Sequence, residues 1–288
     1  GGQVFFVGGG TVAYKGKGAS DSNSGLNPKQ AFSTIQKGLD STITGRGDTV
    51  AILPGSITTT ASLTMTKDDV TLTAAQAVGS RQYPNVTIVS TLAGSLLTID
   101  ANNVTVDSIL FDDNTTSSTS AAAVIDVNSS STGEDFSGVR ILNCTLECTL
   151  GTDASDGALN ALVEGCTIID CGNQAILINV GSENSTIRNC KIYDVADVTT
   201  NGVKVLATSC TIEFCDILIS GADGNGCIHN GVAAARMVAN NNNLAAWGAD
   251  TACVYVIASA TQRTHNNHMT ATAAGNFVNY IGDNTTPS

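Results

Sequence analysis

The sequence predicts an all-β protein that folds as a single right-handed parallel β-helix, a solenoid of short strands with a short N-terminal capping helix. Three observations predict this class: a composition rich in strand and corner residues, a short motif that recurs at the spacing of one coil, and a helix signal ahead of the first strands. Because the repetition continues through most of the chain, it favours one solenoid domain over two separate domains.

The composition favours strands joined by tight turns. Of the 288 residues, 42% are apolar, 13% are charged and 29 are Gly. The abundant Thr, Val and Ile pack well on a pleated surface, and the abundant Gly, Asn and Asp suit corners. A helical bundle would carry more Leu, Glu and Lys.

A six-residue motif recurs through the second half, with the pattern apolar, any, Asn or Gly, Cys, any, apolar. Clear copies occupy residues 141–146, 163–168, 187–192 and 212–217, and less regular copies occupy 106–111, 239–244 and 264–269. The fourth position holds Ile109, Cys144, Cys166, Cys190, Cys215, Asn242 and Asn267, at steps of 35, 22, 24, 25, 27 and 25 residues. At about 3.3 Å per strand residue, the typical step suits three short strands and their corners, which is one coil.

These fourth-position residues are predicted to stack as an inward structural ladder, because equivalent positions of successive coils align in a solenoid. Buried Cys behaves as a small hydrophobe, and parallel inward side chains rarely reach disulfide geometry, so we expect reduced thiols. The Cys spacing does not match a zinc site, and we expect no metal and no cofactor. The long first step predicts a protruding loop or an irregular turn within residues 115–138.

A capping helix is predicted at about residues 27–40. Asn27 suits the N-cap, Pro28 the first helical position and Gln30 the capping box, while Ala31, Phe32, Ile35 and Leu39 supply an apolar face. Such a helix would cover the open end of the core. Residues 1–26 are then predicted to be an N-terminal arm, with 4–7 as an attachment strand, and residues 27–288 the β-helix. Strands are expected at 49–53, 62–65, 70–73, 86–89 and 96–99.

The segments 20–28 (SDSNSGLNP), 31–36 (AFSTIQ), 47–50 (GDTV) and 53–55 (LPG) resemble the opening of pectate-lyase-like β-helix proteins. This resemblance covers about residues 4–75, and the Cys/Asn coils extend it over most of the chain. It implies a superfamily of pectate lyases, polygalacturonases, glycan-cleaving phage tailspikes and non-enzymatic β-helical phage proteins. The chain is most similar to the short virion proteins of tailed phages. A fold does not by itself imply an activity.

Asp112 and Asp113 are the best candidates for glycoside hydrolysis, which needs two carboxyl groups at a fixed separation. They follow Phe111 at a predicted strand end, where a solvated corner is the competing and favoured interpretation. The resemblance to polygalacturonases would imply Asn-Thr-Asp, His-Gly and Arg-Ile-Lys segments, and the sequence contains none of them. With one Trp and five Tyr, a long groove for stacking sugars is not indicated.

The chain carries 13 Lys and Arg against 25 Asp and Glu, a net charge of −12, which disfavours nucleic acid as a partner. No apolar stretch is long enough to span a membrane. The resemblance to short phage β-helices implies a non-enzymatic structural protein of a tailed-phage virion, assembled in the host cytoplasm, that decorates or cements the capsid or forms a short spike; the missing catalytic segments, the reduced cysteines and the acidic surface favour this expectation. Its expected partners are itself, as a homotrimer, and the major capsid or another virion protein. The alternative is a secreted glycan-cleaving tailspike, polysaccharide lyase or hydrolase.

Overall fold

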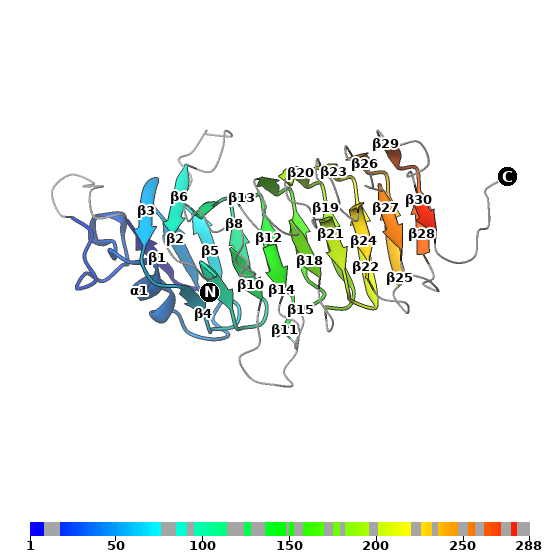
Figure 1. Ribbon diagram of the computed structural model, residues 1–288. Helices are drawn as coiled ribbons and strands as arrows, with labels where there is room; N and C mark the ends of the chain where they lie inside the picture. Colours follow the sequence, from blue (N-terminus) through cyan, green and yellow to red (C-terminus); the bar gives the residue numbers. More distant parts are fainter. Residues whose placement is uncertain are drawn as a thin grey trace.

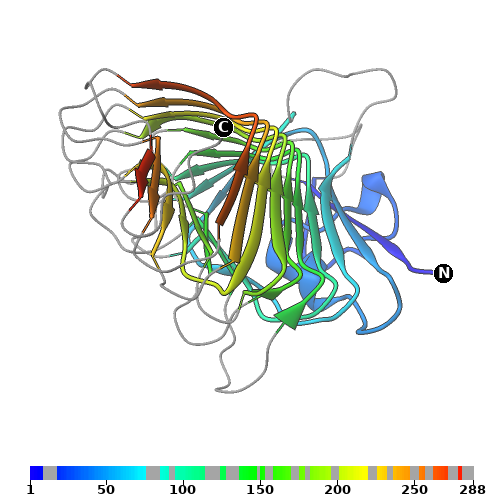
Figure 2. The ribbon, with the colours of Figure 1, turned by 90° about the vertical axis from the view of Figure 1, so that its right-hand side faces the viewer.

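The computed structural model describes residues 1–8, 18–75, 85–90, 95–113, 124–127, 136–147, 150–152, 158–169, 175–178, 182–195, 201–219, 226–231, 236–246, 253–256, 262–271 and 278–280. Their strands form three long parallel sheets that run side by side along one axis (Figure 1). Viewed from the C-terminal end, the coils lie behind one another and wind as a right-handed helix (Figure 2). The predicted all-β solenoid is confirmed.

Each coil contributes one strand to each sheet. Sheet A contains β1 (Val4–Val7), β2 (Thr49–Ile52), β5 (Thr71–Ala74), β8 (Thr105–Asp107), β12 (Arg140–Leu142), β16 (Leu162–Glu164), β19 (Ser185–Arg188), β22 (Ser209–Glu213), β25 (Arg236–Asn240) and β28 (Gln262–His265). Sheet B contains β3 (Gly55–Thr59), β6 (Val86–Ser90), β9 (Leu110–Asp113), β13 (Thr145–Glu147), β17 (Thr167–Ile169), β20 (Lys191–Val195), β23 (Asp216–Ile219), β26 (Asn243–Ala246) and β29 (His268–Ala271).

Sheet C completes the coils. It contains β4 (Leu63–Met65), β7 (Leu97–Ile99), β10 (Ile125–Val127), β14 (Leu150–Thr152), β18 (Ile176–Ile178), β21 (Asn201–Val205), β24 (Gly226–Asn230), β27 (Val254–Val256) and β30 (Val278–Tyr280). A small additional sheet pairs β11 (Phe136–Ser137) with β15 (Ala158–Leu159). The five strands predicted for the first coils correspond to β2, β4, β5, β6 and β7, and their bounds agree within two residues.

The core is a single apolar column, because inward residues of successive coils occupy the same register. In sheet B this inward row comprises Ile57, Ile88, Phe111, Leu146, Ile168, Ile192, Ile217 and Leu244. All of these side chains are buried, and they belong to one continuous cluster. Stacking of like side chains on neighbouring parallel strands is the unit that stabilises such a sheet.

The third position of the sequence motif forms the corner between sheets A and B. Its occupants, Ser108, Asn143, Gly165, Asn189, Phe214, Asn241 and Asn266, all have positive φ angles between 51° and 66°. This left-handed conformation is open to Gly and accessible to Asn, whose short side chain tolerates it. The recurrence of Asn or Gly in the motif is therefore a backbone requirement of this corner.

The fourth position of the motif forms a continuous inward ladder. The carbonyl oxygens of Ile109, Cys144, Cys166, Cys190, Cys215 and Asn242 each accept a backbone N–H from the next coil, at 2.8–3.0 Å. All six of these residues are buried, whereas Asn267 is half-buried. The thiols also donate to carbonyl groups, as Cys190 Sγ does to Arg188 O at 3.3 Å. Of the nine cysteines, the seven in described regions are free and buried.

The N-terminal end differs from the predicted helix at residues 27–40. Asn27 caps only a 3-10 turn, η1 (Pro28–Gln30), and the α-helix α1 (Ile35–Asp40) starts separately after Thr34. The prediction of one helix is wrong because Phe32 is extended and pairs with β1, donating its N–H to Phe6 O at 2.9 Å. The buried Ile35 and Leu39 of α1 still pack against the end of the core, as expected of a cap.

The segment Val4–Val7 is the first strand of sheet A and does not form a free attachment strand. One edge of β1 pairs with β2, and its other edge bonds the backbone of Gly25 and Phe32. The predicted loop within residues 115–138 is also interrupted, because β10 and β11 lie inside that range. The rest of that range, apart from a few residues next to these strands, lies outside the described residues.

Candidate functional site

Asp112 and Asp113 are the last two residues of strand β9, so the predicted strand end is confirmed, and the pair lies in the strand and not in the corner after it. Asp112 is half-buried and occupies an outward position of sheet B, between Val89 of one coil and Glu147 of the next. The side chains of Asp113 and Glu147 lie outside the described part of the structure. The catalytic role of Asp112 and Asp113 stays a prediction.

A different set of polar side chains meets on the outer face of sheet B. The Tyr193 hydroxyl donates to Asp216 Oδ2 at 3.3 Å, and Asn243 Nδ2 donates to Asp216 Oδ1 at 2.8 Å. Asn243 Oδ1 lies 3.1 Å from His268 Nδ1. We call Tyr193, Asp216, Asn243 and His268 the sheet B network; it connects β20, β23, β26 and β29.

The hydrogen bonds of this network define the tautomer of His268. Because the Asn243 amide nitrogen already donates to Asp216, its oxygen faces the imidazole and accepts a hydrogen bond from it. His268 Nδ1 therefore carries hydrogen, and in the neutral ring Nε2 keeps its lone pair. His268 is exposed, so this nitrogen is available to a bound molecule.

At the other end of the network, Asp216 contributes to a raised pKa of the Tyr193 phenol. Burial, the negative charge of Asp216 and the hydrogen bond to it together raise the pKa of Tyr193. The phenol therefore stays protonated at neutral pH and acts as a donor. Lys191, which is exposed, occupies the register position next to Asp216 and adds a cation to the same row.

The sequence signal for this network is the fifth position of the repeat. Lys191, Asp216, Asn243 and His268 all occupy that position in successive coils, and Thr145 and Thr167 precede them in the same row. The motif treats this position as unrestricted, and for that reason the sequence analysis did not single it out. A comparison of the fifth position in successive copies of the motif would have shown that Thr in the earlier coils is replaced by ionisable and amide side chains in the later coils.

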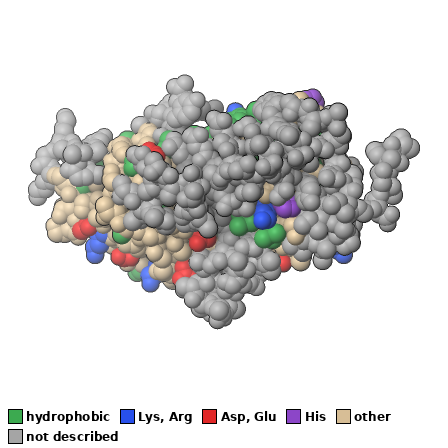
Figure 3. All heavy atoms as spheres, viewed as in Figure 1, with side chains coloured by type: hydrophobic (Ala, Val, Ile, Leu, Met, Phe, Trp, Pro, Cys, Tyr) green, Lys and Arg blue, Asp and Glu red, His purple; other side chains and the backbone are tan. Residues whose placement is uncertain are grey.

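Sheet C presents a second outward row in its C-terminal half. Lys204 of β21 is half-buried and lies at the register position beside His229 of β24, which is 6% exposed. Burial, and secondarily the charge of Lys204, lowers the pKa of His229 to about 4, so the imidazole is neutral at pH 7. The face shown in Figure 3 has cationic, His and hydrophobic side chains in this half of the molecule.

Two further features bear on function. Within the described ranges, no three His, Cys, Asp or Glu side chains are grouped so that they would hold a metal ion. No helix of the described residues has the length and apolar character needed to cross a membrane.

No protein-family model and no curated protein match the sequence. Among solved structures, the fold is similar to ORF18 of Geobacillus virus E2, with 13% identity, a TM-score of 0.41 and coverage of 87% of this chain. This chain spans only 58% of the length of that viral protein.

Two enzyme structures are also similar in fold. The pectin methylesterase PemA from Erwinia chrysanthemi is 14% identical, with a TM-score of 0.49 and coverage of 90% of this chain and 92% of the enzyme. An alginate lyase from Paenibacillus sp. str. FPU-7 is 12% identical, with a TM-score of 0.42 and coverage of 85% and 96%. At these identities the likeness concerns the fold alone, and the strand pairing of the chain itself shows that this fold is a right-handed parallel β-helix.

Proposed function

We propose that this chain is a non-enzymatic structural protein of a tailed-phage virion, which decorates or cements the capsid or forms a short spike. The observation that carries the proposal is the ladder of buried, reduced cysteines. Disulfides form and persist in oxidising compartments, whereas thiols stay reduced in the cytosol. A chain with seven free thiols, four of them stacked in successive coils, suits assembly inside the host cell.

The outer faces support a scaffolding role. Polar side chains of neighbouring coils bond to one another: Arg188 pairs with Glu164 at 2.9 Å, and Asn143 Nδ2 donates to Asp107 Oδ1 at 2.9 Å. These contacts connect coils and stiffen the rod. Solenoid stability is approximately a sum of such contacts between neighbouring coils.

The proposed partners are other copies of this chain, as a homotrimer, and the major capsid protein or another virion protein. The sheets end at β28, β29 and β30, and among the described residues no strand pairs with the outer edges of these three. An unpaired strand edge promotes association with another chain. A subunit or particle protein that covers this end would protect it.

The experiment is cryo-electron microscopy of the phage particles from which the chain derives, supported by antibody labelling with serum raised against the purified chain. We expect density for the β-helix at symmetry-related capsid positions or at a short spike. Absence of the chain from purified particles, together with its presence in the culture medium, would contradict the virion role.

A second candidate function, glycan cleavage, is favoured by the sheet B network. His268 offers a free ring nitrogen, Tyr193 a protonated phenol and Lys191 a cation on one outward surface, and these are groups used in acid–base catalysis. The test is incubation of the purified chain with acidic and neutral polysaccharides, followed by measurement of reducing ends and of absorbance from unsaturated products.

The variants His268→Gln and Asp112→Asn distinguish the two candidate sites on sheet B. Cleavage lost only in His268→Gln would assign the activity to the network, and cleavage lost only in Asp112→Asn would assign it to β9. Absence of cleavage by the unmodified chain on the whole set would count against an enzyme.

A further inference from the structure

The first coil of the solenoid has three strand edges that face the N-terminal end, and the chain covers two of them. In sheet A, the edge of β2 pairs with β1. In sheet C, the side chain of Gln36 takes the place of a strand: its Oε1 accepts from Thr64 N at 2.9 Å, and its Nε2 donates to Thr64 O at 3.1 Å. Each covered edge has its backbone groups satisfied.

The third edge, that of β3 in sheet B, has no such cover among the described residues. Gly55 donates its N–H to Asn85 O on the β6 side, so the backbone groups of Ile57 and Thr59 also point toward β6. The N–H and C=O groups of Ser56 and Thr58 therefore point away from the sheet. Both residues are exposed.

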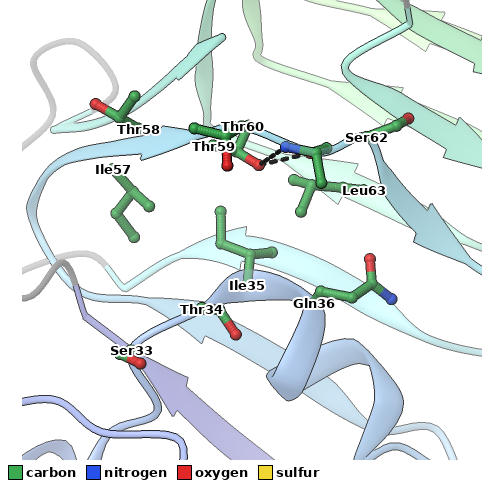
Figure 4. A pocket seen from close by; sticks show the side chains of 11 residues that line it. Ser33, Thr34, Ile35, Gln36, Ile57, Thr58, Thr59, Thr60, Ser62 and Leu63 are labelled. Carbon is green, nitrogen blue, oxygen red and sulfur yellow. Dashed lines mark hydrogen bonds between the residues drawn. The ribbon is translucent and has the colours of Figure 1, made fainter. Parts of the chain in front are cut away.

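A cavity of about 260 Å³ lies along this edge, between β3, the turn to β4 and the start of α1 (Figure 4). Its apolar part is formed by Ile35, Ile57 and Leu63, each buried. The cavity is also lined by Ser33, Thr34, Thr58, Thr59, Thr60 and Ser62. The hydroxyls of Thr34, Thr59 and Ser62 already donate to Asp21 Oδ2, Ala61 O and Ser95 O. None of the described residues that line it is charged.

We propose that the edge of β3 and this cavity bind an extended, uncharged peptide segment of a partner protein, added to sheet B as a parallel strand. The two N–H and two C=O groups of Ser56 and Thr58 supply main-chain hydrogen bonds. The apolar part of the cavity accepts one β-branched side chain of the peptide, and the uncharged Ser and Thr residues around it suit small polar side chains. Since β3 has five residues, the bound segment spans about 16 Å.

Peptide binding fits this position better than binding of a soluble small molecule. At the equivalent edges of sheets A and C, the chain itself supplies strand β1 and the side-chain amide of Gln36, which bonds Thr64 as a peptide group would. The group that would complete the edge of sheet B therefore has the chemistry of an extended backbone. The inference does not depend on the virion role, because any partner with an exposed extended segment meets the same edge.

The test uses hydrogen exchange of the full chain, followed residue by residue by NMR, with and without the peptide acetyl-Lys-Thr-Val-Thr-Val-Thr-Lys-amide. Its uncharged five-residue centre matches the length of β3, and the two terminal Lys residues lie outside that centre and keep the peptide soluble. In the free chain the Ser56 and Thr58 amides should exchange fast and the Ile57 and Thr59 amides slowly, because only the latter pair with β6. With peptide, the exchange of Ser56 and Thr58 should slow by at least about tenfold. Protection of Ser56 and Thr58 in the free chain, or none gained with peptide, overturns the proposal.

Binding of the labelled peptide by variants provides the second measurement. Thr58→Pro removes an outward N–H without breaking a bond to β6 and should weaken binding about tenfold, whereas Thr58→Val keeps that N–H and should bind like the unmodified chain. A peptide with both Val replaced by Pro has the same charge but lacks two donors, and it should not bind. Equal binding of the two peptides would reveal attraction to the acidic surface only and would overturn the proposal. Circular dichroism verifies that each variant is folded.

Discussion

At the scale of single residues, the corner between sheets A and B shows most directly how sequence determines conformation. Six of the seven described corner residues are Ser, Asn or Gly, and the seventh is Phe214. Phe214 has a φ of 55° and is 55% exposed, so its ring is not held by a buried environment. A left-handed conformation costs a residue other than Gly about 1–2 kcal/mol.

Replacing Phe214 by Asn should therefore stabilise the protein by about 1 kcal/mol, because Asn is the residue that the neighbouring coils use at this corner. The urea midpoint of unfolding measures the change. Asn189→Ala is the matched control in the preceding coil and should destabilise by a similar amount. A less stable Phe214→Asn variant would mean that the ring contributes a contact that offsets its backbone strain.

The side chain of Asn242 is expected to be the most sensitive polar group of the ladder. It is 2% exposed, and its Oδ1 accepts from Cys215 N at 2.9 Å while its Nδ2 donates to Ile212 O at 3.1 Å and to Asn267 Oδ1 at 3.0 Å. Asn242→Ala leaves these buried groups unpaired and should cost about 2–4 kcal/mol. Chemical unfolding tests this value, and a loss below about 1 kcal/mol would show that water replaces the amide.

Three of the buried thiols, those of Cys166, Cys190 and Cys210, should be unreactive in the folded protein. Burial and the neighbouring Cys215 raise the pKa of Cys210 to about 12, and the pKa values of Cys166 and Cys190 are also raised. Little thiolate is then present at pH 8. N-ethylmaleimide labelling followed by peptide mass spectrometry should modify these three cysteines only in guanidinium chloride. Rapid labelling of the native chain at Cys190 would show that the ladder opens.

At the scale of elements, the N-terminal end is held by a buried carboxylate. Asp48 is fully buried and accepts from Gln3 N and Ile43 N at 2.8 Å each, and Arg46 donates to both of its oxygens. The hydrogen bonds from Arg46, and then those from the two backbone groups, lower the pKa of Asp48 to about 2. Asp48 thus connects β1, the turn after α1 and β2.

This lowered pKa predicts acid sensitivity of the N-terminal end. A carboxyl group whose pKa is lower in the folded state stabilises the protein fully above its unfolded value near 4, and this stabilisation is lost as the pH falls toward 2. The loss should amount to about 2 kcal/mol. Hydrogen exchange of the β1 and β2 amides between pH 5 and pH 2 measures it. Asp48→Asn should be less stable at pH 7 and should show a smaller decline below pH 4; an unchanged pH profile would contradict the assignment.

At the scale of the whole molecule, the two ends of the solenoid differ in how far described segments cover them. The N-terminal end carries α1 and β1, whereas β28, β29 and β30 end their sheets with no described strand beyond them. Light scattering coupled to size-exclusion chromatography should therefore give three times the monomer mass for the proposed trimer. A mass equal to one chain at micromolar concentration would contradict self-association and leave the particle protein as the partner that covers this end.

The sequence by itself determined the period of the coils, the identity of the corner residues and the inward ladder. These depend on local preferences, such as the tolerance of Asn and Gly for positive φ and the alternation of strand residues between faces. It also indicated a cap at residues 27–40, but it did not predict that Phe32 would leave the helix to pair with β1. Local helix signals at Asn27 and Pro28 were real, and a long-range strand contact interrupted the helix after one turn.

Only the tertiary structure decided which outward side chains meet and which strand edges stay open, because both depend on the pairing of residues about 25 positions apart in the sequence. The sheet B network brings Tyr193 and His268 onto one surface, although 75 positions separate them in the sequence. The open edge of β3 is likewise invisible in sequence, because it follows from how β1 and Gln36 cover the other two edges. The physical reason is that one strand's own residues specify its faces, whereas its edges are specified by whichever segments pack beside it.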